Sequence, residues 1–465
     1  MYEIKYLMSP LRIRDKDGAL SVYCRNSFER LDNVTMIWSL FEDTKMLDRG
    51  TKTGLNFGPG DTVKIPYPAS LPETRTPGAQ YLLNVMLFAG ERDLGYAQIV
   101  LGCDEPMEYK NESCDAHSQN LSFGEGVTRN VTDEACSKRR ITLTAGNTKV
   151  TFTDGMLSRM TRGEQVLLDG PMQLSFYRVN TDNDGIIRGI RKRHFRDLWD
   201  DRHLDKPVFQ VENYEMSDDG DTKVLKFIGK IVFEGLYQGF FAEITYRLYA
   251  DGTVGVAVEG NPFGMLPDVL PRIGVTFATE KAQNQVTWYG RGWQENYPDR
   301  KSCTLIGRFE GDVPSMSVHY ERPQDNGVRC DTRYVGLRCA GGEEGLLFSS
   351  CDGFAFAIHD YTIDALRNAD HRHELVKDDA HNHLYLDYAV RGLGSNSCGP
   401  EPEEEYELHP HAFRFVFAVS PWRGEEDALC HARSAFGERT AALGERYRFA
   451  YDPDKNRENF DCRIN

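Results

Sequence analysis

The sequence predicts an all-β protein in which a small β-sandwich precedes a much larger one. Short segments of alternating apolar and polar residues recur along almost the whole chain, and turn-forming clusters separate them. A regular alternation of strand and helix patterns is missing, which argues against a fold built from βαβ units. The 465 residues leave room for roughly two to four domains, each with its own core.

Residues 1–103 form the first predicted domain, an immunoglobulin-like β-sandwich. Two of its segments carry apolar side chains at every second position, which places them on one face of a strand. These side chains are Met36, Trp38 and Leu40 in the first segment, and Tyr81, Leu83, Val85 and Leu87 in the second.

A polar stretch with few aliphatic residues, 104–140, is predicted to be a linker. Strand patterns return after it and predict a large β-sandwich over 141–422. Within that range the dipeptides Asp154-Gly155 and Asp251-Gly252 are typical of tight hairpin turns, because Gly adopts a positive φ without strain. Only two stretches look helical, 194–203 and the first part of a partly helical tail, 423–465.

The charge balance limits the partners. The 55 Lys and Arg against 71 Asp and Glu give a net charge of −16, so nucleic acid and anionic membranes would be repelled. No stretch approaches the roughly 18 apolar residues of a spanning helix, and the first ten residues lack the pattern of a signal peptide. The 11 cysteines are scattered and include no CxxC pair, which favours reduced thiols and a cytoplasmic location.

Common catalytic and nucleotide-binding motifs are absent from the sequence. It contains no GxGxxG before a helix, no GxxxxGK[ST], no GxSxG and no HExxH. It also lacks the strand and helix alternation of a barrel with carboxylates at its strand ends. If the chain acts on sugars, its own catalytic machinery is not evident.

Six motifs in the large domain mix aromatic, amide and charged residues in a way that solvent-facing strands do not require. They are YRVNTDND (177–184), LPRIG (270–274), WYGRGWQENYPDR (288–300), YERPQDNGVRCDTR (320–333), HRH (371–373) and GLGSNSCGP (392–400). In order and spacing they resemble the C-terminal domain of the glycoside hydrolase family 2 β-galactosidases. Residues 2–102 resemble the immunoglobulin-like domain that precedes it in that family.

The resemblance implies the fourth and fifth of five domains, the fifth being a large supersandwich related to galactose mutarotase. The family's acid/base and nucleophile glutamates lie on a barrel that this chain lacks, so no catalytic residue is expected here. The chain would be a non-catalytic part or small subunit of an enzyme that hydrolyses β-galactosides such as lactose. Its partner would be the large catalytic subunit or the missing N-terminal domains, in a hetero- or homo-oligomer. No cofactor is implied for this chain; Mg²⁺ and Na⁺ are left to the assembled enzyme.

Two loops are implied to border the substrate. The loop with Asn396, Ser397 and Cys398 reaches the mouth of the barrel in the family, and Cys398 matches a position where some members place a stacking Trp. The stretch that begins at Gly185, after the YRVNTDND motif, resembles a loop that in the family moves near the active site when substrate binds, which implies that Asp182, Asn183, Asp184 and Gly185 border the substrate. The alternatives are a turn shaped by glycines and a solvated basic loop.

The remaining candidates have two interpretations. Trp293 and Tyr297 beside amides and ions are residue types that hold carbohydrate, but buried Arg–carboxylate pairs often tie strands together. The candidates for a sugar groove or a structural network are Trp293, Glu295, Asn296, Tyr297, Asp299, Arg300, Arg329 and Arg333.

The histidines His371 and His373, with His381 and His383, have i, i+2 spacing, which predicts that each pair shares one face of a strand. Cross-strand packing or a polar cleft lining is favoured over a metal site, and no metal site is predicted. With Glu374 they also leave open a second function, a free-standing sugar-binding or epimerising sandwich of the mutarotase type.

Overall fold

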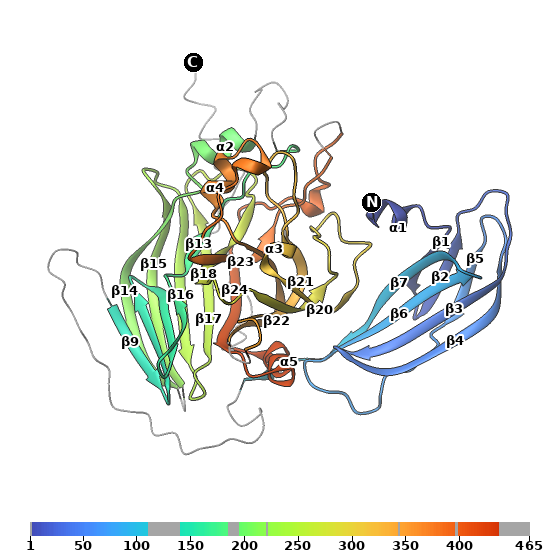
Figure 1. Ribbon diagram of the computed structural model, residues 1–465, viewed down its shortest axis with the longest axis horizontal. Helices are drawn as coiled ribbons and strands as arrows, with labels where there is room; N and C mark the ends of the chain where they lie inside the picture. The colour runs from blue at the N-terminus through green and yellow to red at the C-terminus, as the bar shows by residue number, and fades with distance from the viewer. Residues whose placement is uncertain are drawn as a thin grey trace. The chain divides into compact units, whose positions relative to one another are not determined.

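The computed structural model of the protein describes residues 2–109, 140–184, 195–219, 222–342, 345–395 and 399–436 (Figure 1). The chain divides into two compact units. The first contains residues 1–107, 289–293 and 300–309, and the second contains residues 108–288, 294–299 and 310–465. Most of the predicted linker and the end of the predicted tail, residues 110–139 and 437–465, lie outside the described residues.

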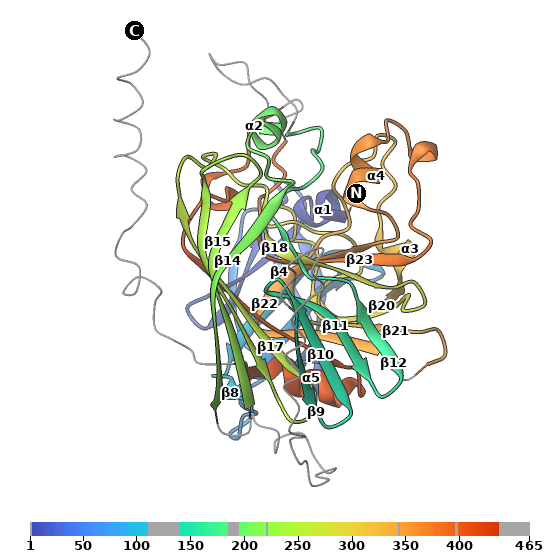
Figure 2. The same cartoon turned by 90° about the vertical axis from the view of Figure 1, so that its left-hand side faces the viewer.

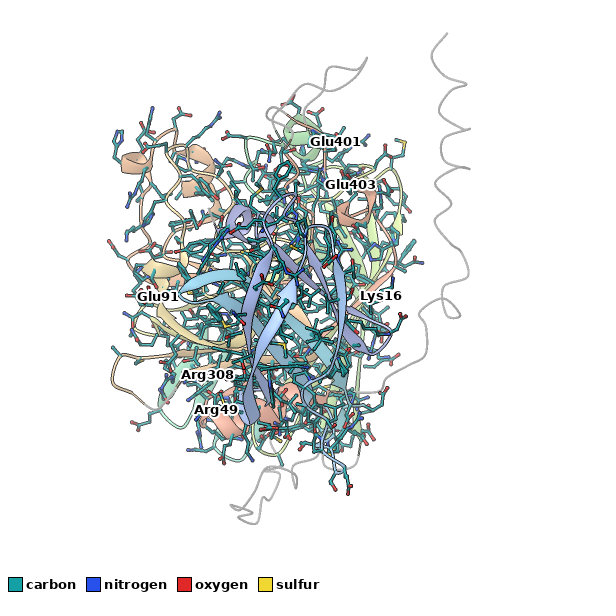
Figure 3. The ribbon with its side chains drawn as sticks, turned by 90° about the vertical axis from the view of Figure 1, so that its right-hand side faces the viewer. Lys16, Arg49, Glu91, Arg308, Glu401 and Glu403 are labelled. Carbon is teal, nitrogen blue, oxygen red and sulfur yellow. The ribbon has the colours of Figure 1, made fainter. Side chains whose placement is uncertain are left out.

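The first unit is a two-sheet β-sandwich with one short helix, as Figure 3 shows from the side of these strands. Its elements are α1 (Tyr2–Leu7), β1 (Leu11–Lys16), β2 (Ala19–Cys24), β3 (Leu31–Glu42), β4 (Lys45–Phe57), β5 (Thr62–Pro66), β6 (Gln80–Ala89) and β7 (Arg92–Cys103). One sheet has the order β1-β2-β5 and the other β4-β3-β6-β7. In Figure 3, Lys16 marks the end of β1 and Glu91 the turn between β6 and β7.

The predicted alternation is confirmed in this unit. On β6 the four side chains at every second position from Tyr81 to Leu87 are fully buried. On β3, Met36 and Leu40 are buried and Trp38 packs against the same core. Gly50, on the neighbouring strand β4, leaves the space that the Trp38 ring occupies. Met36, Leu83, Val85 and Leu87 belong to one continuous core between the two sheets, and Trp38 packs against it.

The second unit contains most of the strands. They are β9 (Arg140–Ala145), β10 (Thr148–Thr153), β11 (Met156–Arg162), β12 (Gln165–Asp169), β13 (Gln173–Ser175), β14 (Pro207–Asp219), β15 (Thr222–Phe233), β16 (Gly239–Leu248), β17 (Val254–Phe263), β18 (Arg272–Glu280), β21 (Arg329–Arg338), β22 (Gly345–His359), β23 (His381–Val390), β24 (Phe413–Pro421) and β25 (Ser434–Ala435). Strands β8 (Met107–Glu108), β19 (Gln285–Arg291) and β20 (Ile306–Asp312) contribute residues to both units.

Two sheets organise the second unit. The large one runs β13-β18-β23-β22-β24-β17-β16-β15-β14, and the small one runs β12-β11-β10-β9. Figure 2 shows the four strands of the small sheet side by side in teal. The predicted hairpin between β10 and β11 is confirmed, because Asp154 and Gly155 both have a positive φ, 50° and 84°. The predicted all-β fold class is therefore confirmed.

Helices are short, and the sequence predicted two of them. Helices α2 (Phe195–Asp201) and α5 (Glu425–Arg433) lie in the two predicted stretches. The expectation of only two helical places was wrong, since α1, α3 (Val313–Met316) and α4 (Ile363–Asn368) also form. Side-chain caps from Asp312 and Thr362 begin α3 and α4, which are too short to show a helical period.

Candidate functional site

Two buried arginines and two acidic residues form an ionic network in the second unit. We call Arg178, Asp184, Arg391 and Glu407 the Arg178 network. Arg178 Nη2 donates to Asp184 Oδ1 over 2.8 Å, and Arg391 Nη1 donates to the same oxygen over 2.9 Å. Arg391 also donates from Nη2 to Glu407 Oε1 over 2.8 Å. All four side chains are at most 7% exposed, so two positive and two negative charges neutralise one another away from water.

The Arg178 network joins two of the predicted loops. Asp184 Oδ2 accepts hydrogen bonds from the backbone N–H and the hydroxyl of Thr181, at 3.1 and 3.0 Å, which closes the turn of the YRVNTDND motif. Arg178 Nη1 donates to the carbonyl oxygen of Arg391 over 2.8 Å, and its Nη2 donates to that of Gly392 over 3.3 Å. The first motif is thus fixed to the start of the GLGSNSCGP loop.

Electrostatics keep Arg178 charged. Burial alone would lower the pKa of its guanidinium, but the attraction and the hydrogen bonds of Asp184 outweigh burial and raise the pKa above its ordinary value. Arg178 therefore stays positively charged at any physiological pH.

The Gly392–Ser395 segment, which we call the rim loop, is held on both sides. Asp299 Oδ2 accepts the backbone N–H groups of Leu393 and Gly394, at 2.8 and 2.6 Å. Asn183 Nδ2 donates to the carbonyl oxygen of Gly394 over 2.7 Å. Residues from three separate motifs therefore meet here, and the predicted candidates Asn183, Asp184 and Asp299 lie together.

Asp182 lies beside the same turn and contacts the YERPQDNGVRCDTR motif. Its backbone N–H donates to Gln324 Oε1 over 3.1 Å, and Gln324 Nε2 donates back to Asp182 Oδ2 over 3.4 Å. The side chains are exposed, so this contact leaves the tip of the turn accessible.

A second buried group, which we call the Arg272 cluster, lies where β18 meets β23. Arg272 Nη2 donates to Asp325 Oδ1 over 3.0 Å, and the Tyr297 hydroxyl donates to Asp325 Oδ2 over 2.8 Å. Asp387 completes the cluster, with Oδ1 3.7 Å from Arg272 Nε. Gly274 stands opposite Asp387 in the ladder, where a Cβ would come within 2.5 Å of the carboxylate. Glycine in the LPRIG motif therefore provides space for a buried acid.

Asp387 differs from the other acids of the site. Its side chain is fully buried, and neither carboxylate oxygen has a hydrogen-bond partner among the described residues. Burial raises the pKa of Asp387 to about 7, although the charge of Arg272 opposes this rise.

The other candidates of the two central motifs make structural contacts. Glu295 accepts from the Tyr320 hydroxyl at 2.6 Å and from the Gly327 N–H at 2.9 Å. Asn296 Oδ1 accepts the N–H of Cys330 over 2.8 Å. Arg329 donates to the carbonyl oxygen of Met316 over 3.0 Å, and Arg333 donates to that of Cys351 over 3.1 Å. These contacts favour the structural interpretation over a sugar groove.

Comparison with known protein families identifies the large domain. Residues 144–419, more than half of the chain, match the family model described as the beta-galactosidase small chain. The chain belongs to this small-chain family. The residues of the Arg178 network, the rim loop and the Arg272 cluster all lie within the matched range.

Longer relatives align with most of the length of this chain. The beta-galactosidase of Actinobacillus pleuropneumoniae is 25% identical over 430 residues, which are 90% of this chain and 39% of that protein. The beta-galactosidase of Arthrobacter sp. strain B7 is 33% identical over 269 residues, 54% of this chain and 26% of that protein. The small chain thus spans about two fifths of the first of these relatives.

Solved structures with some likeness to the small chain include a galactose 1-epimerase from Lactobacillus acidophilus, at 8% identity and a TM-score of 0.27. The match covers 66% of this chain and 99% of the epimerase chain. An exo-chitosanase from Amycolatopsis orientalis, at 12% identity and a TM-score of 0.19, covers 56% of this chain and 26% of its own.

Some predicted residues of the small chain do not join this site. Trp293 and Arg300 belong to the first unit, whereas Glu295 to Asp299 belong to the second. Gly185, Asn396, Ser397 and Cys398 lie outside the described residues, so their predicted place at the substrate stays a prediction.

The prediction that His371 and His373 share a strand face was wrong. They lie at a 3₁₀ turn, Arg372–Glu374. Glu374 Oε2 accepts hydrogen bonds from the backbone N–H groups of Asp370 and His371, just before this turn. The local sequence is polar throughout and offers no apolar face to a sheet. His381 and His383 do lie on β23, and His383 Nε2 is 2.8 Å from Asp378 Oδ2.

The described residues contain no group of three or more His, Cys, Asp or Glu side chains placed to hold a metal ion.

Sequence reasoning overlooked the central members of the site. Arg178, Arg272 and Arg391 each interrupt an apolar segment, and a charged residue inside such a segment signals a buried partner. Their partners could not be assigned, because Arg391 and Asp184 are 207 positions apart.

Proposed function

We propose that this chain is a non-catalytic component of a β-galactosidase, its small subunit or C-terminal part. In this proposal the assembled enzyme hydrolyses terminal β-D-galactosides such as lactose. The chain borders the active site and stabilises the assembly, while a separate catalytic chain or further N-terminal domains supply the reacting groups.

One observation carries this proposal: 90% of the chain aligns with relatives named beta-galactosidase, yet it accounts for only 39–40% of the length of the first two. About three fifths of those proteins have no counterpart in this chain. The family match to the beta-galactosidase small chain points the same way.

The chemistry of the buried acids supports a non-catalytic role. Retaining hydrolysis needs two carboxyl groups about 5–5.5 Å apart that both reach the sugar. Asp184 is surrounded by two arginines and a threonine, and Asp299 uses one oxygen for two backbone N–H groups. Asp387 is sealed from solvent. None of these three acids is placed to attack or protonate a glycoside.

The rim loop and the Asp182–Asp184 turn are the parts of this chain that we expect to border the substrate. Their support is rigid: a charge-paired network lies beneath them, and hydrogen bonds hold both the N–H and the carbonyl of Gly394. A rim held in this way can define the space for the leaving group without taking part in bond breaking.

The proposed location is the cytoplasm, on the grounds of charge and cysteine usage. Within the part of the chain that the structure describes, no helix is long and apolar enough to cross a membrane.

A second candidate function, a free-standing sugar-binding or epimerising sandwich, has one observation in its favour. Side chains from β14 to β17 and β24 line a hollow of about 420 Å³, which is large enough for a sugar. Its lining is charged, with Lys226 paired to Glu243 at 2.8 Å and Arg414 paired to Glu259 at 2.7 Å.

The histidine site of this second candidate is poorly built for acid–base chemistry. His371 and His373 are 66% and 81% exposed, and Glu374 is occupied by the backbone of its own turn. An epimerase needs an acid and a base that converge on an enclosed sugar.

A mutarotation assay, a hydrolysis assay and co-purification with the catalytic chain separate the two functions. We expect the purified chain to show neither galactose epimerisation nor hydrolysis of a nitrophenyl β-galactoside. We also expect it to co-purify with the catalytic chain encoded in the same genome. Anomer interconversion by the chain alone, lost in Glu259→Gln, would instead establish the second function.

A further inference from the structure

Helix α1 reverses the usual arrangement of a surface helix. Such a helix normally buries its apolar stripe and exposes its charged side chains. In α1 no residue is buried, and the charged and aromatic residues make the contacts to the rest of the first unit. The helix is the blue element beside the N label in Figure 1.

Glu3, Lys5 and Tyr6 are among the residues that attach α1 to the rest of the first unit. The N–H of Cys303 donates to Glu3 Oε2 over 3.0 Å, and Lys5 Nζ is 3.0 Å from Asp93 Oδ2. The Tyr6 ring meets the edge of the Tyr96 ring, with centroids 5.2 Å apart. Since Glu3, Lys5 and Tyr6 face the sandwich, the aliphatic residues between and after them are turned outward.

Apolar side chains of α1 and of the residues beside it are exposed. Ile4 is 65% exposed, Leu7 41% and Met8 70%. Tyr2, 55% exposed, makes an edge contact at 5.4 Å with Trp293, which is 59% exposed. We call these five residues the α1 surface.

Exposure of this kind is costly unless a partner covers it. A six-residue helix is only marginally stable in water. Because no residue of α1 is buried, packing against the first unit adds little to its stability. Aromatic and aliphatic side chains that cluster around an exposed Trp and Tyr have the composition of an interface hot spot. The net charge of −16 argues against an anionic bilayer as the covering partner.

We propose that the α1 surface is a docking site for the catalytic chain of the β-galactosidase, an inference that rests on the proposed function. The occupant is identified by what the relatives contain: they carry the missing three fifths of their length in the same polypeptide as the part that aligns here. A chain that supplies only two fifths must present a surface to the rest, and the α1 surface is apolar, exposed and attached to the first unit through Glu3, Lys5 and Tyr6.

The test measures binding of the purified catalytic chain from the same genome to immobilised full-length variants of this chain. Ile4→Asp and Met8→Asp place a charge in the middle of the α1 surface, and each should weaken binding by at least about tenfold. Trp293→Ala should have a similar effect. The matched control is Tyr237→Ala, which removes an aromatic side chain that is 81% exposed in the second unit and should change affinity by less than about twofold.

Each outcome decides one claim. Binding by the wild-type chain that both aspartate variants retain, with hydrogen exchange at residues 2–8 unchanged in the complex, would overturn the docking site and leave the proposed function standing. No binding by the wild-type chain would count against the proposed function itself. A concentration-dependent dimer of the chain that Ile4→Asp abolishes would assign the surface to a second copy and overturn the inference. Circular dichroism confirms that each variant is folded.

Discussion

Asp184 and Asp387 are both fully buried carboxylates of the second unit, but their surroundings are opposite. Asp184 accepts hydrogen bonds from two arginines and from Thr181, so both of its oxygens are satisfied. The oxygens of Asp387 have no hydrogen-bond partner within the described part of the chain, and its nearest cation, Arg272 Nε, is 3.7 Å away. Burial raises the pKa of Asp387 to about 7, so that the neutral acid is favoured below neutral pH.

The difference follows from position. Asp184 ends a turn where side chains from two loops converge, which allows several donors to reach it. Asp387 lies inside β23 opposite Gly274, where the ladder offers it space but no donor. A buried acid between two loops therefore fixes them, whereas a buried acid within the sheet makes stability depend on pH.

Loss of Asp184, whose two carboxylate oxygens both accept hydrogen bonds, should have the largest effect on stability. Asp184→Ala leaves two buried guanidinium groups without their shared partner, and we expect the free energy of unfolding to fall by about 3–5 kcal/mol. Urea denaturation followed by fluorescence measures this change. The control is Asp169→Ala, which breaks a two-pronged contact with Arg159 on the surface and should cost about 0–1 kcal/mol. Equal losses in the two variants would contradict the role assigned to the Arg178 network.

Asp387, whose carboxylate has no hydrogen-bond partner among the described residues, should make the free energy of unfolding depend on pH. The folded-state pKa of Asp387, about 7, lies above the unfolded value of about 3.9. Its contribution to stability is therefore fully present below about pH 4 and is lost as the pH rises through 7, by up to about 4 kcal/mol. Asp387→Asn cannot ionise and should lose this dependence, so the variant should gain relative to wild type between about pH 4 and pH 7. A difference between the two proteins that stays constant over this range in urea denaturation would show that Asp387 does not titrate as described.

The fold should require a glycine at position 274, because a side chain there would collide with Asp387. In Gly274→Ala the new Cβ would lie 2.4 Å from the carbonyl oxygen of Leu386 and 2.5 Å from Asp387 Oδ1, so backbone must shift. We expect a loss of about 1–3 kcal/mol in the free energy of unfolding. Gly342→Ala is the comparison, because the nearest atoms to its Cβ would be at 3.4 Å, and thermal melting should barely change. A Gly274→Ala protein as stable as wild type would mean that β18 and β23 adapt without strain.

The smallest expected effect concerns the rim loop. Asp299→Ala frees the N–H groups of Leu393 and Gly394 and should cost about 1–2 kcal/mol, mostly as local opening. Hydrogen exchange at these two amides should accelerate. Asp378→Ala is the matched control, since Asp378 Oδ1 likewise accepts two backbone N–H groups, of Ala380 and His381, in another loop. Unchanged exchange at Leu393 and Gly394 would mean that Asn183 and the backbone hydrogen bonds of Gly392 and Ser395 hold the loop without Asp299.

The fold was largely predictable from the sequence because its signals are local. Alternation from Tyr81 to Leu87 and the Asp154-Gly155 turn each act within a few residues, and both were confirmed. The candidate site was predictable only in part. Asn183, Asp184 and Asp299 were chosen through their motifs, but the pairing of Asp184 with Arg391 joins positions far apart in the chain, and periodicity carries no information on such contacts.

Two other features escaped prediction for physical reasons. His371 and His373 have the spacing of a strand face, but capping by Glu374 turns the backbone into a 3₁₀ turn instead. Helix α1 is too short for a helical period, and its apolar residues point away from the core, so the pattern gave no sign of its orientation.

Reconstitution of activity tests the central claim most directly. The chain, the catalytic chain from the same genome and their mixture are each assayed with a nitrophenyl β-galactoside, in host cells that lack β-galactosidase. We expect no turnover by this chain alone and a large gain when it is added to the catalytic chain. Turnover by this chain alone, or full activity of the catalytic chain without it, would show that the proposed function is wrong.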